Sequence, residues 1–281
     1  MREVEEHAAR GGRERADAEG AVAHAALDQQ DRPHRTAIRV SFEKVGAEWK
    51  PVAAPPSRLS WTICHDGRRL AALDSHLPEP PREDLRFLTA HEVAPGQQVP
   101  FVGTPSMEFA GWMGSEVFRP MALTSGPSCG DPEHWRPAEP PAAVVEHLIT
   151  ALREVEKGIH DCDVRGSPRA YRFPDTDVRA VQGFVSDPGA RIVSLAIRLP
   201  EDLAARCGVL TAAGWQPHTF AVLPGGEVAH LGFGLTFVDA GDYDGDGHSE
   251  VLFQSSSYDA DGYTLAYDSL RKSAHLDWSY H

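Results

Sequence analysis

Short runs of apolar and β-branched residues, separated by turn residues, fill most of the chain after residue 41 and predict β-strands. Four hairpins are predicted, over residues 42–52, 59–73, 178–199 and 219–231, with turns at 46–47, 65–67, 187–189 and 224–226. Further strands are predicted over 85–93, 100–102, 107–112 and 117–125. The 22 prolines and 25 glycines fit a chain with many turns. The pattern therefore predicts a mainly β fold built from antiparallel sheets.

One segment has helical spacing instead. Its apolar residues recur three and four positions apart, at Val144, Val145, Leu148, Ile149, Leu152 and Val155. Pro141 suits the first turn of this helix and Gly158 suits its end. We expect the apolar stripe to pack on a sheet rather than on a partner protein. A proline-rich stretch, 132–141, precedes the helix, and a boundary between two lobes is possible near residues 130–165.

Residues 1–38 differ from the rest of the chain. They contain no aromatic residue and are rich in alanine, arginine, glutamate, glycine and aspartate. Such a segment buries too little apolar surface to offset the entropy of ordering, so we expect it to be disordered or weakly helical. The β domain is then expected over 39–281. No secretory signal is visible, because His24 interrupts the alanine-rich run 21–27, and no segment is long and apolar enough to span a membrane.

Three strands are expected at the C-terminus. Residues 251–256 and 263–267 flank a stretch that contains Asp261 and Gly262, and an Asp-Gly pair between apolar runs is typical of a hairpin turn. A further run, 275–280, ends the chain. Together these runs predict a three-stranded meander.

An acidic stretch just before this meander has the spacing of a calcium-binding loop. It offers three alternate carboxylates, a backbone carbonyl and a fourth carboxylate at positions 1, 3, 5, 7 and 9, from Asp242, Asp244, Asp246, His248 and Glu250. Gly247 at position 6 permits the sharp turn. Calcium tolerates irregular oxygen geometry better than magnesium, so we predict Ca²⁺. The competing interpretation is a solvated acidic turn that binds nothing, but four adjacent carboxylates without a cation repel one another.

The flanking residues distinguish this loop from an EF-hand. An EF-hand needs a glutamate at position 12 and a helix on each side. Position 12 is Phe253, and the flanks, 232–238 and 251–254, have the aromatic and β-branched composition of strands. We therefore expect the ion between two strands.

The stretch 228–281 resembles the FG-GAP repeat, also called the VCBS repeat, of integrin-type β-propellers. In that repeat a Phe-Gly pair and a strand lead into an Asp-x-Asp-x-Asp-Gly loop, followed by a second strand. Phe233 and Gly234, the acidic loop, and residues 251–253 follow the same order. Two features depart from it, since serines at 255–257 replace the usual Gly-Ala-Pro and only one clear copy is present. The resemblance implies a small or degenerate propeller in which a structural calcium fixes a blade connection without a catalytic role.

Charge and cysteine content narrow the functional classes. The formal net charge of -14 and the pI near 5.4 argue against nucleic acid or an anionic membrane as a partner. The four cysteines form no Cys-x-x-Cys pair, so a zinc ribbon or a thioredoxin-like motif is not supported. An even number permits disulfides in an exported protein. Cys162 with Cys207 is the pair we favour, and four free or buried thiols are the equal alternative.

Enzyme signatures are weak. Residues 126–130 fit the Gly-x-Ser-x-Gly pattern of a hydrolase, but the residues after them do not start a helix cleanly. Residues 160–163 could hold a transition metal, although adjacent polar residues in a loop are more often solvated. The 14 histidines are scattered along the sequence rather than paired.

The sequence therefore leads us to expect a non-catalytic, calcium-stabilised, propeller-like protein. We expect an extracellular or periplasmic monomer that binds a protein or carbohydrate through loops on one face. One alternative is a secreted hydrolase on a propeller scaffold, in which Ser128, His65 or the acidic residues line a pocket. A protein with no assigned activity is a further alternative.

Overall fold

The structure is a computed structural model that describes residues 23–27, 37–79, 90–100, 102–104, 106–109, 117–162, 168–199, 216–256 and 260–279. Within these residues the chain is mainly β, its strands pair antiparallel, and it contains one α-helix. These parts of the prediction are confirmed. The strand pairing alone does not establish that the sheets form a propeller.

The first part of the chain forms a curled sheet of seven strands. In sheet order they are β1 (Ala23–Leu27), β7 (Met121–Thr124), β4 (Arg58–His65), β5 (Arg68–His76), β6 (Ala90–Val93), β2 (Ala37–Val45) and β3 (Glu48–Pro51). β1 also pairs with β2, so the sheet curls until its first strand meets its sixth. The predicted hairpins β2–β3 and β4–β5 are confirmed. Gly46, Asp66 and Gly67 adopt the left-handed conformation that their tight turns require.

The C-terminal part forms a four-stranded sheet. β15 (Leu235–Gly241), β16 (Glu250–Ser256), β17 (Ala260–Tyr267) and β18 (Lys272–Ser279) each pair with the next. The predicted C-terminal meander is confirmed, and β15 adds a fourth strand. The acidic loop connects β15 to β16, which confirms that it lies between two strands rather than two helices.

A third sheet has five strands. In sheet order they are β14 (Val228–Phe233), β13 (His218–Val222), β12 (Arg191–Ile197), β11 (Val178–Val185) and the short β8 (Arg136–Pro137). Both hairpins predicted here are confirmed. The helix α1 (Ala142–Val155) begins directly after Pro141. A two-stranded ribbon, β9 (His160–Cys162) and β10 (Pro168–Ala170), and the 3-10 turn η3 (Asp175–Asp177) connect α1 to β11.

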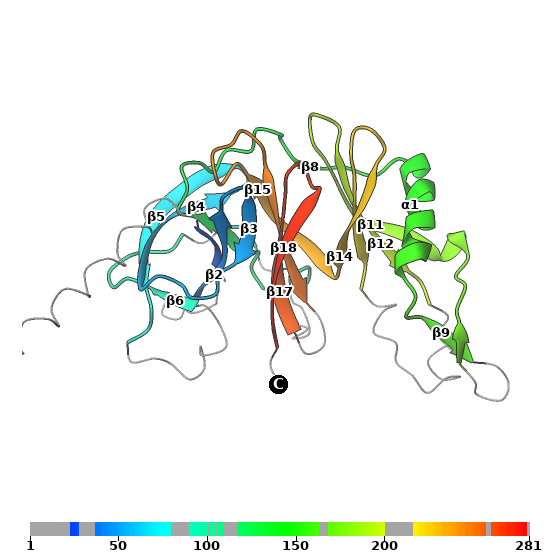
Figure 1. Cartoon of the computed structure of the whole chain (residues 1–281), viewed down its shortest axis with the longest axis horizontal. Helices are drawn as coiled ribbons and strands as arrows, with labels where there is room; N and C mark the ends of the chain where they lie inside the picture. The colour runs from blue at the N-terminus through cyan, green and yellow to red at the C-terminus, as the bar shows by residue number, and fades with distance from the viewer. Residues whose placement is uncertain are drawn as a thin grey trace, which may run out of the picture.

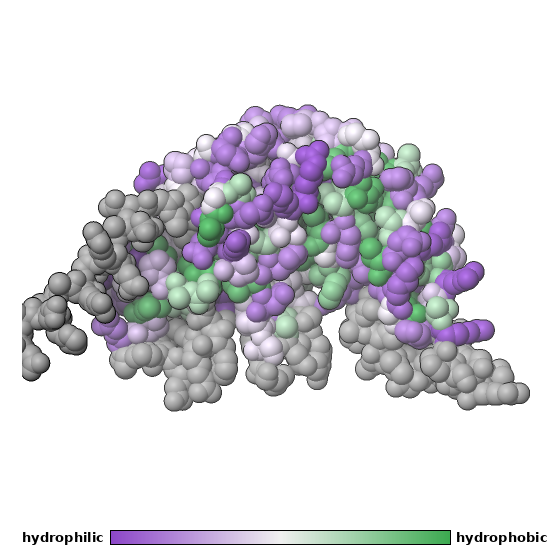
Figure 2. All heavy atoms as spheres, in the orientation of Figure 1, coloured by the Kyte–Doolittle hydropathy of each residue, from purple (hydrophilic) through white to green (hydrophobic). Residues whose placement is uncertain are grey.

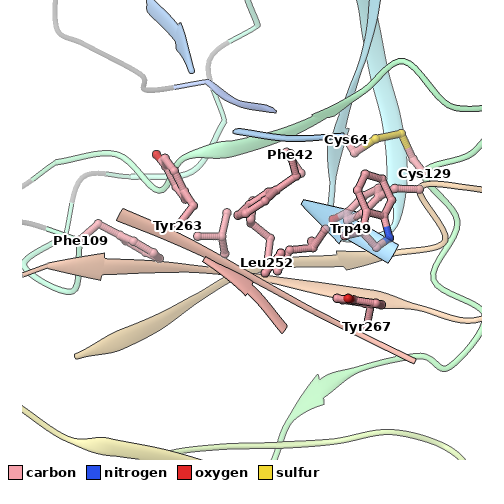
Figure 3. Close-up of a cluster of buried hydrophobic side chains, with 13 residues drawn as sticks. Phe42, Trp49, Cys64, Phe109, Cys129, Leu252, Tyr263 and Tyr267 are labelled. Carbon is pink, nitrogen blue, oxygen red and sulfur yellow. A yellow bond between two sulfur atoms is a disulfide. The ribbon is translucent and has the colours of Figure 1, made fainter. Parts of the chain in front are cut away.

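The sheets stack face to face in an arch that runs from the curled sheet through β15–β18 and β11–β14 to α1 (Figure 1). Successive residues of a strand point to opposite faces, and β16 uses both. Leu252 packs towards the curled sheet with Phe42 and Tyr263 (Figure 3), whereas Phe253 packs towards the third sheet with Ile192. All of these side chains are buried. The four-stranded sheet is therefore covered on both faces.

The helix covers the outer face of the third sheet. Leu148 and Leu152 are fully buried and pack with Phe220 and Leu195. The predicted packing of the apolar stripe on a sheet is thus confirmed. α1 is the last layer of the arch, and no helix of the described residues has the length and hydrophobicity needed to cross a membrane.

Hydrophilic residues gather along the upper rim of the arch (Figure 2), where the turns of the β11–β12 and β13–β14 hairpins lie (Figure 1). Gly189 and Gly226 in these turns have positive φ angles. The rim is therefore a row of polar connections at one end of the stacked sheets.

Three sequence expectations need correction. Residues 23–27, within the segment expected to lack structure, form β1, because β2 and β7 supply ladder hydrogen bonds on both sides. Residues 107–109 are a turn rather than part of a strand, and β7 is shorter than predicted, whereas residues 85–89, ahead of β6, lie outside the described residues. Asp261 and Gly262 lie inside β17, opposite Ser256 and Ser255, and not in its turn. Residues 1–22 and 28–36 lie outside the described residues.

Candidate metal centre

Two glycines shape the acidic loop between β15 and β16. Gly245 and Gly247 have φ angles of 80° and 88°, a conformation that strains other residues. The turn predicted at Gly247 is thus present, and Gly245 adds a second one. A side chain on Gly245 would also come within 2.8 Å of Cγ of Pro127. The chain consequently folds back on itself within a few residues.

Three of the predicted ligands converge in this loop. One ligand atom from each of Asp242, Asp244 and Glu250 lies within 4.8 Å of the other two. Backbone N–H groups hold the carboxylates in place, because Gly247 donates to Oδ2 of Asp242 over 3.0 Å and Tyr243 donates to Oε2 of Glu250 over 2.9 Å. The other oxygen of Asp242, Oδ1, is buried and has no hydrogen-bond partner. A buried carboxylate oxygen without a partner is a free ligand atom.

Asp246 and His248 lie at the edge of this group. The carboxylate of Asp246 is 48% exposed and accepts a hydrogen bond from N–H of His248 over 2.9 Å. The imidazole of His248 is 61% exposed, and its Nδ1 lies 3.7 Å from Oε1 of Glu133. Ligation by Asp246 and by the His248 carbonyl stays a prediction.

Glu250 is the most perturbed acid of the loop. Its side chain is almost completely buried, and burial together with the nearby charge of Asp244 raises the pKa of its carboxyl group to about 9. Tyr243, which lies between Asp242 and Asp244 in the sequence, is fully buried and packs in the core with Phe42 and Leu252. Its ring therefore anchors the loop to the core.

Lys44 of β2 contributes a positive charge that the sequence analysis did not predict. Its ammonium group lies against Oδ2 of Asp244 and 3.9 Å from Oδ2 of Asp246. Burial lowers the pKa of Lys44, but the hydrogen bond and charge of Asp244 outweigh burial and raise the pKa overall. This contact joins the curled sheet to the acidic loop across 200 residues of sequence.

The end of β7 and the segment that follows it make hydrogen bonds to the acidic loop. A disulfide joins Cys64 of β4 to Cys129, with 5.4 Å between their Cα atoms. Directly after it, the carbonyl of Gly130 accepts a hydrogen bond from N–H of Asp242 over 2.6 Å. Oγ1 of Thr124 donates to the carbonyl of Tyr243 over 3.1 Å. The disulfide therefore anchors the segment that holds the first predicted ligand.

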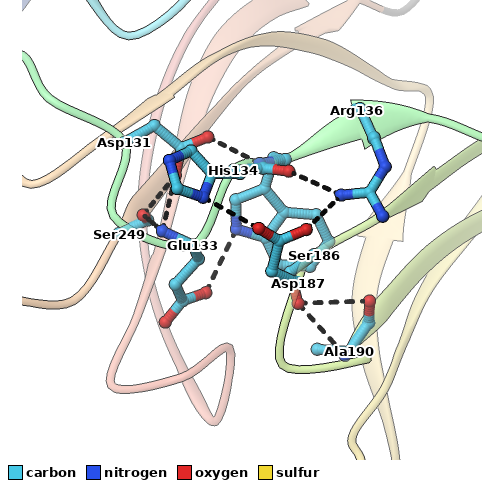
Figure 4. Close-up of polar contacts among 9 residues, drawn as sticks. Asp131, Glu133, His134, Arg136, Ser186, Asp187, Ala190 and Ser249 are labelled. Atoms are coloured by element: carbon cyan, nitrogen blue, oxygen red, sulfur yellow. Dashed lines mark hydrogen bonds and ion pairs between the residues drawn. The ribbon is translucent and has the colours of Figure 1, made fainter.

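A polar network extends from the loop to the neighbouring sheet (Figure 4). Oγ of Ser249 donates to Oδ1 of Asp131 over 2.5 Å, and Oδ2 of Asp131 accepts from N–H of Trp135 over 2.6 Å. Arg136 donates to Oδ1 of Asp187 over 2.5 Å, in the β11–β12 turn. The acidic loop and this turn are thus connected through one short segment.

A second charge cluster surrounds the buried Asp239 of β15. Oδ1 of Asp239 accepts a hydrogen bond from N–H of Asp66 over 3.0 Å and lies 3.5 Å from the guanidinium of Arg119. Burial raises the pKa of Asp239 to about 6. Hydrogen bonds from His65 and Arg119 lower the pKa of Asp66 well below its usual range. The cluster links β15 to the β4–β5 turn.

The hydrolase pattern does not form a nucleophile elbow. Oγ of Ser128 accepts a hydrogen bond from N–H of Gly130 over 2.9 Å, and Cys129 is committed to the disulfide. The chain then continues into a turn and not into a helix. His65 lies beside Asp66, with 3.2 Å between Nδ1 and Oδ2. The candidate Gly-x-Ser-x-Gly motif is therefore a structural turn.

The described residues contain one disulfide that the sequence did not predict, Cys64–Cys129, and the favoured pair Cys162–Cys207 stays a prediction. Cys64 and Cys129 are bonded, so the alternative of four free or buried thiols is wrong. Sequence spacing gave no sign of this pair, because only the pairing of β4 with β7 brings Cys64 beside the segment after β7. Cys207 and the side chain of Cys162, like the side chains of the polar run 161–163, lie outside the described residues.

Comparison with known proteins adds no relative. No protein-family model, curated protein or solved structure matches the chain. The resemblance to the FG-GAP repeat thus rests on the loop residues and their flanking strands.

Proposed function

We propose that the acidic loop binds one Ca²⁺ and that this ion fixes the connection between β15 and β16 in a non-catalytic binding protein. The convergence of Asp242, Asp244 and Glu250 carries the proposal, together with the unpartnered Oδ1 of Asp242. Carboxylate oxygens are the ligands that calcium prefers, and a loop with two positive-φ glycines accommodates its irregular geometry.

Charge balance supports a divalent ion. With Asp242, Asp244 and Asp246 ionised and the raised pKa of Glu250 keeping its carboxyl group protonated, Lys44 offsets only one of three negative charges. Ca²⁺ would offset two more and would bridge carboxylates that otherwise repel one another. Binding energy gained in this way becomes folding energy, because the unfolded chain does not hold these residues together.

The stacked sheets support a propeller-like arrangement. β11–β14 and β15–β18 are two consecutive up-and-down four-stranded meanders that pack face to face, as neighbouring blades do. Only Gly234 separates β14 from β15, so one meander leads directly into the next. In this arrangement the acidic loop would be a strand connection of one blade, as the FG-GAP resemblance implies.

The disulfide supports a location outside the cytoplasm. Disulfides persist in oxidising compartments, and Cys64–Cys129 anchors the segment that contacts the loop. Extracellular calcium levels also fill loops of modest affinity. We therefore propose an extracellular or periplasmic protein that presents rim loops to a protein or carbohydrate partner.

Melting experiments test the calcium site. Calcium at about 100 times its Kd should stabilise the folded chain by about 2.7 kcal/mol, and a chelator should reverse this gain. Asp244→Ala should abolish the effect of calcium, whereas Glu146→Gln, an exposed acid on α1, should leave it unchanged. Equal melting temperatures with calcium and with EDTA would refute the proposal.

A further inference from the structure

Two histidines that are 12 residues apart in sequence meet at the edge of the third sheet. His218 lies in β13 and His230 in β14, one step apart in the ladder that pairs Phe220 with His230. Nδ1 of His218 lies 3.1 Å from Nε2 of His230. The scattered histidines of the sequence therefore do form a pair, because the β13–β14 hairpin brings these two together.

A buried carboxylate orients the first ring. Oε2 of Glu156, the residue that ends α1, lies 3.0 Å from Nε2 of His218. Its other oxygen, Oε1, accepts hydrogen bonds from N–H of Gly158 and of Ile159 over 2.6 and 3.2 Å. Glu156 and His218 are less than a tenth exposed. The carboxylate accordingly fixes the proton of His218 on Nε2 and leaves a lone pair on Nδ1.

The second ring is neutral. Burial and the nearby charge of His218 lower the pKa of His230, so its imidazole carries one proton and one lone pair. With the lone pair of His230 on Nε2, two lone pairs face each other across 3.1 Å, and a cation shared by the two rings would satisfy both.

We propose that His218 and His230 form a second metal site, which binds a divalent transition ion such as Zn²⁺ through Nδ1 of His218 and Nε2 of His230. With a metal about 2.0–2.1 Å from each nitrogen, the nitrogen–metal–nitrogen angle would be about 100°, which lies between the square-planar and tetrahedral values. Glu156 would act as the outer carboxylate that commonly holds a metal-binding histidine.

Exposure and ligand chemistry separate this site from the acidic loop. His230 is exposed, so an ion can reach it and its ring has room to turn towards that ion. Phe220 and His230 pack with ring centres 5.1 Å apart, which gives one side of the site an apolar wall. Imidazole nitrogens suit zinc, copper and nickel, whereas the carboxylates of the loop suit calcium. Coordination positions that the two histidines leave free are available to water or to a ligand.

Zinc titration of the full chain, at saturating calcium, tests this site. We expect about one zinc ion per chain at the pair and at least a tenfold loss of affinity in His230→Gln. Glu156→Gln should weaken zinc binding by about 10–100-fold, because the amide presents a donor to Nε2 of His218 and reverses its tautomer. His147→Gln, on the exposed face of α1, is the matched control and should bind zinc like the wild type.

Two further measurements keep the outcome clear. Circular dichroism and melting establish that each variant is folded, and calcium titration should be unchanged in all of them, so the pair is tested independently of the acidic loop. Nitrogen hyperfine structure in the spectrum of the Cu²⁺-loaded protein should disappear in His230→Gln. Equal zinc affinity in the wild type and His230→Gln would overturn the proposal and leave a shared proton between the rings.

Discussion

The ammonium group of Lys44 lies against the carboxylate of Asp244, although 200 residues separate them in sequence. Lys44 is thus a built-in counter-ion of the acidic loop, held by a strand of the curled sheet. A lysine and a divalent ion in one site repel each other, so the two compete for the same carboxylate.

The variant Lys44→Met tests whether Lys44 both neutralises the carboxylates of the calcium-free loop and competes with calcium for them. Without the ammonium group, calcium should bind about tenfold more tightly, while the calcium-free protein should melt at a lower temperature because its carboxylates lose their counter-charge. Calcium titration and melting with EDTA measure the two effects. Lys50→Met, an exposed lysine of β3, is the control. Unchanged calcium affinity in Lys44→Met would show that Lys44 does not share the site.

Loss of the Cys64–Cys129 disulfide should weaken both the fold and the calcium site. The bond closes a loop of 65 residues, which corresponds to about 4 kcal/mol in the chain-entropy model. The segment it anchors also contacts Asp242 through Gly130. We expect the double variant Cys64→Ala and Cys129→Ala to unfold at lower urea concentration and to bind calcium less tightly. A variant that loses stability but keeps full calcium affinity would separate the disulfide from the site.

Asp239 should make stability depend on pH between about 4 and 6. Burial raises the pKa of its carboxyl group from 3.8 to about 6, so in this range the folded protein holds a proton that the unfolded chain releases. The contribution of Asp239 to stability therefore falls as pH rises through this window, by about 3 kcal/mol, and then stays level. Asp239→Asn should lack this part of the decrease, whereas the part that comes from the raised pKa of Glu250 should be the same in both proteins. Urea unfolding from pH 4 to 7 measures it, and parallel curves for the two proteins would contradict the assignment.

Gly262 should not tolerate a side chain. A Cβ atom there would come within 2.3 Å of Oδ1 of Asp277 and 2.5 Å of Oγ of Ser255. We expect Gly262→Ala to lose about 1–3 kcal/mol of unfolding free energy. Gly225→Ala is the matched control, because a Cβ atom in that exposed turn meets nothing within 4 Å. Similar urea midpoints for the two variants would show that β17 and β18 can shift apart.

Local pattern predicted most hairpins, and the reason is physical. Turns such as Gly46-Ala47 need positive φ angles that few residue types adopt, so sequence and conformation are tightly coupled there. Gly262 shows the limit of this reasoning. Its Asp-Gly pair has the composition of a turn, but the glycine is needed for close approach between strands, which depends on partners that the local sequence does not contain.

Some residues of the candidate site could likewise be predicted from the local sequence, and others could not. Spacing identified Asp242, Asp244 and Glu250, because ligands within one loop are close in sequence. Lys44 and the Cys64–Cys129 disulfide come from the curled sheet and reach the loop only through tertiary packing. The pairing of His218 with His230 likewise depends on strand register. Long-range neighbours of this kind leave no periodic pattern in a single sequence.

Calorimetric titration of calcium into chelator-treated protein tests the central claim most directly, with Asp242→Asn as the comparison. The wild type should bind one calcium ion per chain. Asp242→Asn should bind it at least tenfold more weakly, because its amide lacks the negative charge of the carboxylate whose Oδ1 has no hydrogen-bond partner. No calcium-dependent heat in the wild type, or equal affinity in the two proteins, would contradict the account.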